Sequence, residues 1–192
     1  MIKNLNYFLQ SVIIYFLLFV GKIIGLNASR KLFSFIFILI AQKFKSPDII
    51  KKNLKIFSTS LSLKEEKEII SNMWKNYGMT FIEYMYLEFF RKNKSHIVIK
   101  GEKNLYNLIH NKTPVVFVSG HFANYELMSM EITKRDIKLA TIYRPLNNFF
   151  LNPLMESLRK KYVCKNQIKK GINGVREAIE YIKKGFSIAL MI

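Results

Sequence analysis

Apolar residues in the second half of the chain fall into short runs separated by longer stretches with helical periodicity. Strand-like runs cover 114–119, 138–143 and 186–192, an alternating stretch covers 96–100, and helical patterns cover 103–111, 124–134, 149–162 and 172–184. Short apolar runs bounded by Gly, Pro or charged residues are typical of buried strands. Strands that alternate with helices of this length favour right-handed βαβ units. The pattern therefore predicts an α/β fold with a mostly parallel sheet flanked by helices.

The N-terminal part of the chain begins with two apolar runs. Residues 5–26 are about long enough to span a bilayer, although Asn6, Gln10 and Lys22 interrupt the run. The second run, over 32–41, is too short to span as a helix. Basic residues flank both runs, so the pair fits helices on a membrane surface as well as buried globular helices. We expect a membrane-anchoring helical segment over residues 1–45, spanning or lying on the membrane, and an α/β domain over residues 46–192.

Between these parts lies one long helical pattern. Ser46-Pro47-Asp48 marks a break and a helix start, and the stretch that follows is short and basic. From Ser62 to about Arg91 the apolar residues repeat with a period near 3.6, which predicts a single long helix. Glu83 and Glu88 fall within it, and acids at such positions most often lie on a solvated helix face.

Composition adds a strong positive charge to this picture. The chain has 31 Lys and Arg against 13 Asp and Glu, a formal net charge of +18, which suggests an acidic partner. Lys outnumbers Arg 25 to 6, a bias that an AT-rich genome also produces. The charge is dispersed, half of the residues are apolar and no nucleic-acid motif is present, so we expect no nucleic-acid partner. The single Cys164 excludes an internal disulfide and a cysteine-based metal cluster.

The candidate chemistry follows the strand over 114–119, where Gly120 precedes His121, and Glu126 comes five positions later. Open α/β sheets bind their ligands at the carboxyl ends of their strands. Histidine can accept a proton near neutral pH, and a carboxylate can hold its imidazole in one tautomer. In a regular helix the two side chains would lie about 140° apart. They can meet only if His121 lies in a turn, which Gly120 permits, before a helix that carries Glu126. On spacing alone, a structural His–Glu pair is equally consistent.

Other polar residues near this motif have simpler interpretations. His96 and His110 lie outside it and are interpreted as surface histidines. Asn124 is interpreted as a helix cap rather than a residue that lines the site. Cys164 is interpreted as an ordinary thiol.

Ser119–Glu126 resembles the H-x4-[D/E] motif of the glycerolipid acyltransferase superfamily, and more closely that of the lipid A lauroyl/myristoyl acyltransferase family. The resemblance continues on both sides of the motif, over 99–105, 142–148 and 174–185. Arg159 stands where the family has an Arg at the end of the following helix. The N-terminal hydrophobic helix agrees as well, so the resemblance covers essentially the whole chain. It implies a fold like that of glycerol-3-phosphate acyltransferase.

The resemblance also implies a reaction. A fatty acyl chain would pass from acyl carrier protein to a hydroxyl of a lipid A precursor, a phosphorylated glucosamine lipid, in lipopolysaccharide biosynthesis. His121 would act as the general base and Glu126 would orient it. Arg159 and Arg144 would bind substrate phosphate or a developing oxyanion, with Arg159 the stronger candidate and Arg144 equally a structural strand-end residue. No metal is implied, and no cofactor beyond the carrier thioester. The expected location is the anionic cytoplasmic face of the bacterial inner membrane.

Two alternatives to this function stay open. Another glycolipid acyltransferase, such as one that acts on phosphatidylinositol mannosides, would share the superfamily motif. In the family that the chain resembles, the strand matching 186–192 leads into an Asp-containing segment. We therefore expect the α/β domain to be incomplete at its C-terminus, and a truncated, catalytically inactive membrane-bound fragment is the second alternative.

Overall fold

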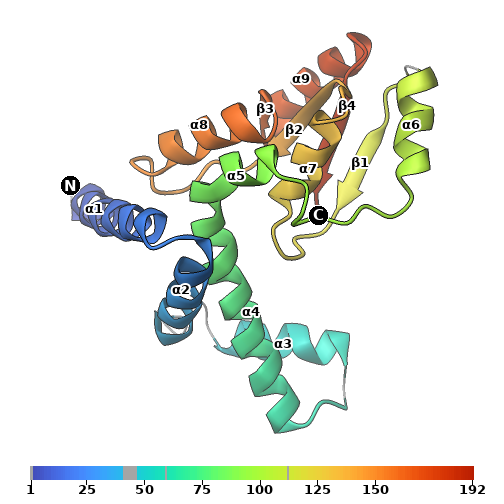
Figure 1. The fold of residues 1–192 in the computed structure, drawn as a ribbon. Helices are drawn as coiled ribbons and strands as arrows, with labels where there is room; N and C mark the ends of the chain where they lie inside the picture. The colour runs from blue at the N-terminus through green and yellow to red at the C-terminus, as the bar shows by residue number, and fades with distance from the viewer. Residues whose placement is uncertain (1, 41–46, 59, 112) are drawn as a thin grey trace. The chain divides into compact units, whose positions relative to one another are not determined.

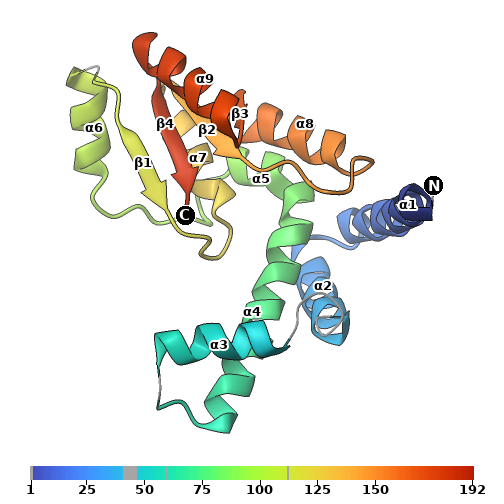
Figure 2. The same cartoon turned by 180° about the vertical axis from the view of Figure 1, so that it is seen from behind.

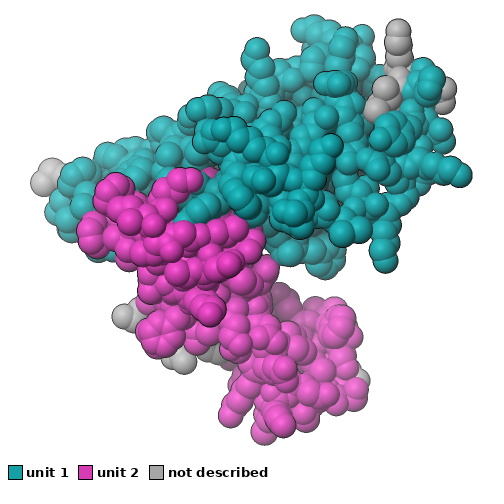
Figure 3. All heavy atoms as spheres, in the orientation of Figure 1, with its two compact units in different colours: residues 1–15, 85–192 teal, residues 16–84 magenta. Residues whose placement is uncertain are grey.

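The computed structural model of the protein describes residues 2–40, 47–58, 60–111 and 113–192. The chain forms two compact units, one from residues 1–15 and 85–192 and the other from residues 16–84 (Figure 3). The first helix, α1 (Ile2–Ile23), contributes to both units. The predicted domain boundary between residues 45 and 46, and the helix-start signal at Ser46, lie outside the described residues.

A four-stranded, all-parallel sheet forms the centre of the first unit (Figure 1). Its strands are β1 (Val116–Ser119), β2 (Leu139–Tyr143), β3 (Asn166–Lys169) and β4 (Ser187–Met191), in the spatial order β1-β4-β2-β3. At the carboxyl ends, Ser119 of β1 pairs with Met191 of β4, and Tyr143 of β2 pairs with Lys169 of β3. Leu139, the first residue of β2, pairs with the first residue of β4. The four carboxyl ends therefore lie along one edge. The predicted α/β class with a mostly parallel sheet is confirmed.

Helices cover both faces of this sheet (Figure 2). The helices of the first unit after α1 are α5 (Leu87–Lys92), α6 (Glu102–Asn111), α7 (Glu126–Thr133), α8 (Asn152–Tyr162) and α9 (Ile172–Lys183). On one face, Ala178 of α9 packs in a core cluster with Ala140, Ile168 and Ile188. Alternate side chains of a strand point to the opposite face. There Phe117 and Tyr143 meet residues of α7 and α8 respectively.

The alternating stretch 96–100 forms no strand; it is an irregular connection between α5 and α6. His96 is half-buried, and its ring lies 4.8 Å from the ring of Phe90, centroid to centroid. The interpretation of His96 as a surface residue is therefore wrong, whereas His110 is exposed on α6. The alternation instead provides apolar side chains, Ile97 and Ile99, that line a cavity described below.

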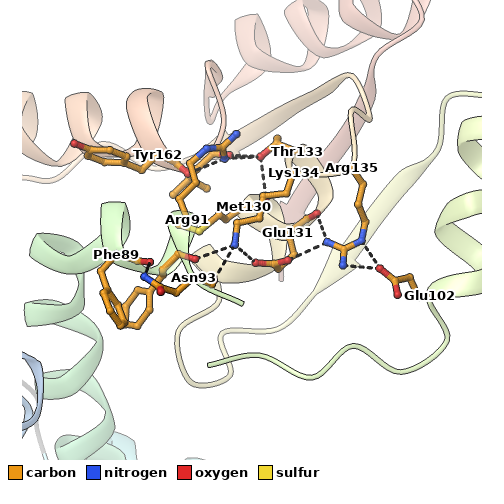
Figure 4. Close-up of polar contacts among 12 residues, drawn as sticks. Phe89, Arg91, Asn93, Glu102, Met130, Glu131, Thr133, Lys134, Arg135 and Tyr162 are labelled. Carbon is orange, nitrogen blue, oxygen red and sulfur yellow. Dashed lines mark hydrogen bonds and ion pairs between the residues drawn. The ribbon is translucent and has the colours of Figure 1, made fainter. Parts of the chain in front are cut away.

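A chain of ion pairs links α6 to the end of α7 (Figure 4). Arg135 Nη2 lies 2.6 Å from a carboxylate oxygen of Glu102, and Arg135 Nη1 lies 2.9 Å from one of Glu131. Lys134 Nζ lies 2.6 Å from the other carboxylate oxygen of Glu131. Burial raises the pKa of Glu131, but the hydrogen bonds from Lys134 and Arg135 outweigh it, and the net pKa lies below the ordinary value. The carboxylate is thus held charged between two cations.

The second unit contains α2 (Leu26–Ile40), α3 (Pro47–Phe57) and α4 (Leu63–Glu83). The missing side chain of Gly78 lets α4 approach the backbone of Phe33 in α2 closely. α4 begins with a capping box, in which Ser62 Oγ accepts from the Glu65 N–H at 3.3 Å and Glu65 Oε2 accepts from the Ser62 N–H at 2.8 Å. The predicted helix start at Ser62 is therefore confirmed.

The long helix predicted from Ser62 to Arg91 is interrupted. A 3-10 turn, η2 (Tyr84–Tyr86), separates α4 from α5. Glu83 lies just before it and is 6 % exposed, with Oε1 2.7 Å from Nε of Arg30. Glu83 is therefore a buried residue in an ion pair and does not lie on a solvated helix face.

One helix among the described residues, α1, is long and apolar enough to cross a membrane. It corresponds to the first apolar run, and α2 corresponds to the described part of the second.

Candidate active site

His121 lies in the loop between β1 and α7, at the carboxyl edge of the sheet. The Phe122 N–H donates to the Gly120 carbonyl over 2.9 Å, which makes a tight turn with His121 at its apex. The imidazole lies edge-on to the ring of Tyr125, with centroids 4.8 Å apart and planes at 74°. Glu126 is the first residue of α7. His121 thus lies in a turn and Glu126 in the first turn of the helix that follows. This is the arrangement that their five-residue spacing requires if the two side chains are to meet.

The turn is built differently from the expectation. The left-handed backbone falls on Ala123, with a φ of 44°, and not on Gly120. A Cβ at position 120 would lie 2.6 Å from the ring of Phe122, so a larger residue there would have to displace this exposed side chain. Tyr125 is the N-cap residue of α7 and makes no side-chain capping bond, so the interpretation of Asn124 as a cap is wrong.

Glu126 is bound by Arg159 of α8. Nε and Nη2 of Arg159 each lie 2.8 Å from Oε1 of Glu126, and the two side chains are only 11 % and 9 % exposed. The guanidinium also lies over the ring of Tyr143, 5.6 Å from its centroid. The carboxylate therefore has its charge balanced and its position fixed at the start of a helix, where the dipole favours an acid.

Tyr143 is a residue of this site that sequence reasoning did not identify. It is buried at the end of β2 beneath Arg159. Burial, together with the nearby carboxylate of Glu156, raises the pKa of Tyr143 to about 12, so the phenol stays uncharged. Tyr143 directly precedes Arg144 in the segment 142–148, which matches the family, and this position could have identified it from the sequence.

Arg144 is exposed immediately after β2. Because β4 lies between β1 and β2, the ends of these two strands are separated by two strand spacings, about 10 Å. The structure thus brings Glu126 and Arg159 into contact and places His121 and Arg144 on either side of the end of β4. Phosphate binding by either arginine, and an orienting role of Glu126 toward His121, stay predictions.

Cys164 lies away from this edge. It is buried, and its Sγ donates to the carbonyl of Leu139, the first residue of β2, over 3.1 Å. Burial raises the pKa of its thiol. Both observations fit the interpretation of Cys164 as an ordinary thiol.

A model of the bacterial lipid A biosynthesis acyltransferases matches residues 2–192. The chain belongs to this family. No curated protein sequence matches it. The resemblance drawn from His121, Glu126 and their flanking segments is therefore confirmed. Membership in the lipid A acyltransferase family indicates an acyltransferase with a lipid acceptor and an acyl donor, and together with α1 it suggests association with a membrane.

This member of the lipid A acyltransferase family has an apolar cavity of about 440 Å³ beside α7. Its walls come from α6, β1, α7 and the connection over 97–101; they include Leu105, Phe117, Leu127, Met128 and Ile132. Leu127 directly follows Glu126 in α7, so the helix that carries the motif acid also lines the cavity. The volume falls within the range of about 300–1,000 Å³ that is typical of ligand pockets.

Proposed function

We propose that this protein transfers a fatty acyl chain from acyl carrier protein to a hydroxyl of a lipid A precursor, a phosphorylated glucosamine lipid. The observation that carries the proposal is the position of His121, at the apex of an exposed turn on the carboxyl edge. The buried Glu126–Arg159 pair lies at the start of the next helix. Family membership supports the reaction class.

In the proposed reaction, His121 accepts the proton of the acceptor hydroxyl as its oxygen attacks the thioester carbonyl carbon. The tetrahedral intermediate collapses, the C–S bond breaks, and the imidazolium returns its proton to the departing thiolate. The products are an ester and the free thiol of the carrier. No protein nucleophile is needed, in keeping with the buried position of Cys164.

Glu126 serves in this proposal as the acid that stabilises the imidazolium, and Arg159 supports catalysis by holding Glu126 in place. Arg159 is therefore a positioning residue. Arg144 is exposed and stands about 10 Å along the same edge, by two strand spacings, from the end of β1. A cation at that separation suits a phosphate that is remote from the reacting hydroxyl, so we assign phosphate binding to Arg144.

The apolar cavity beside α7 would hold the transferred acyl chain. It is lined by half-buried aliphatic and aromatic side chains, and a hydrocarbon chain is stabilised by contact with such apolar walls. The net charge of +18 favours both an acidic carrier protein and the anionic cytoplasmic face of the inner membrane as partners.

The proposal is tested by incubating the protein with acyl–acyl carrier protein and a defined lipid A precursor in bilayers, followed by mass spectrometry of the lipid. We expect an increase in mass equal to one fatty acid minus one water. A matched precursor that lacks the acceptor hydroxyl should show no increase. Transfer to a different glycolipid, with none to the lipid A precursor, would contradict the proposal.

A further inference from the structure

The helix α1 is docked along one side by protein. The backbone carbonyl of Tyr7 accepts from Asn148 Nδ2 over 2.9 Å, and Tyr15 Oη donates to the carbonyl of Phe150 over 2.9 Å. Between these contacts, the rings of Phe8 and Phe150 lie 5.5 Å apart, centroid to centroid. The contacts extend from Tyr7 to Tyr15, about 12 Å of helix. All of them involve the connection over 148–150, between β2 and α8 (Figure 1).

The side of α1 that faces protein continues beyond these contacts. Its members recur at helical spacing; they are Tyr7, Ser11, Ile14, Leu18 and Gly21. Ser11 and Leu18 are 3 % and 2 % exposed. A lone spanning helix would be surrounded by lipid, whereas α1 has one covered side along nearly its whole length.

The opposite side of α1 is an exposed apolar stripe. It consists of Leu5, Leu9, Val12, Phe16, Phe19 and Ile23, each of them at least half exposed. At about 100° per residue these positions fall within a narrow arc. The exposed side chains of Phe8, Ile13 and Tyr15 widen the stripe on both sides. Exposed polar residues lie beyond them, about 100° or more from the centre of the stripe, among them Asn6, Gln10 and Lys22. An apolar stripe with polar margins is the pattern of a helix that lies in the plane of a membrane interface.

We infer that α1 lies in the plane of the bilayer interface, with this stripe in the lipid and the connection over 148–150 packed along the flank of the helix. A spanning orientation would put the exposed amides of Asn6 and Gln10, and the docked connection, into hydrocarbon, which is costly. The in-plane orientation leaves them at the level of the headgroups. It also keeps the connection that begins with Arg144 within about one helix diameter, 10 Å, of the headgroups. The carboxyl edge then meets its lipid acceptor at the bilayer surface.

The inference rests on membrane association but not on the proposed acyl transfer. It is tested by spin-label depth measurements on the full chain in bilayers with anionic lipid. Single labels are placed through Leu5→Cys, Val12→Cys and Phe19→Cys on the stripe, and through Gln10→Cys outside it. Each is made with Cys164→Ala, so that a single thiol is present. All four positions are exposed, so the labels do not disturb the core.

We expect the three stripe labels at one common depth, about 5–10 Å below the headgroups, and the Gln10 label in contact with water. A spanning helix would instead put the Val12 label near the bilayer centre, about 15 Å deep, with Leu5 and Phe19 on opposite sides of it. That profile would overturn the inference. Equal access of a water-soluble reagent to all four labels would overturn it as well.

Discussion

Arg159 donates from both Nε and Nη2 to the same carboxylate oxygen of Glu126, over 2.8 Å in each case. The two residues are 33 positions apart and belong to different helices, α7 and α8. The carboxylate of Glu126 is therefore not solvated, and it already has a charged partner. It is a buried charge whose position depends on one arginine, and this dependence can be measured.

Arg159→Ala should destabilise the fold by about 3 kcal/mol, because it leaves the buried Glu126 carboxylate uncompensated. The free energy of unfolding, measured by urea titration in detergent solution, gives this value directly. Glu126→Gln should cost much less in the Arg159→Ala background than in the wild type. Lys183→Ala is the control, since it removes an exposed ion pair with Glu180 and should change stability by less than about 0.5 kcal/mol. Additive effects of the Glu126 and Arg159 substitutions would refute the coupling.

The Glu131 cluster should make stability depend on pH in the acid range. Its folded-state pKa lies below the ordinary value of 4.5, so the stabilisation is fully present above about pH 4.5. It is lost as the pH falls through the lowered pKa. Glu131→Gln should cost roughly 2 kcal/mol at pH 7, through the weaker bonds to Lys134 and Arg135, and should reduce the decline in stability between pH 5 and pH 3. Urea titrations at pH 7, 5 and 3 would show it, and an unchanged decline in the variant would refute the assignment.

Gly78→Ala should destabilise the unit formed by residues 16–84 by about 2 kcal/mol, because the added methyl group meets the backbone of Phe33. Asn72→Ala, at an exposed position of the same helix, controls for helix propensity and should not destabilise. Thermal unfolding of the two variants provides the comparison. A Gly78→Ala variant as stable as the wild type would show that α2 and α4 have room to separate.

Filling the cavity beside α7 should shift donor preference to shorter acyl chains. Met128→Trp reduces the space lined by Leu105 and Ile132. Each methylene that no longer fits loses about 0.8 kcal/mol, roughly a fourfold change in relative kcat/KM. The measurement is kcat/KM for a series of acyl–carrier donors. Lys103→Trp, at an exposed position of α6 that does not line the cavity, should leave the preference unchanged. The same length preference in Met128→Trp and the wild type would place the acyl chain elsewhere.

Much of the fold follows from local patterns. The apolar runs that became β1, β2 and β4 are each bounded by Gly, Pro or charged residues, and the capping box at Ser62 is visible in four consecutive residues. β3 was missed because only Ile168 of its four residues is both apolar and buried. The long helix was predicted without its break because the helical period continues through Tyr84–Tyr86.

The candidate site was predictable only in part. The positions of His121 and Glu126 relative to the turn follow from their spacing and from the end of β1. Two contacts of Arg159 depend on how α8 packs on the sheet: its ion pair with Glu126 and the position of its guanidinium over the ring of Tyr143. The insertion of β4 between β1 and β2 joins the last strand to the first, a non-local contact that no sequence pattern specifies.

The most direct test of the account is kcat for acyl transfer by His121→Ala, compared with His110→Ala as a matched control on an exposed face of α6. Loss of a general base should lower kcat by about 10²–10⁴-fold in His121→Ala, with unfolding free energies of both variants close to that of the wild type. His110→Ala should keep the wild-type rate. Equal rates for the two variants would contradict the assignment of His121 as the base.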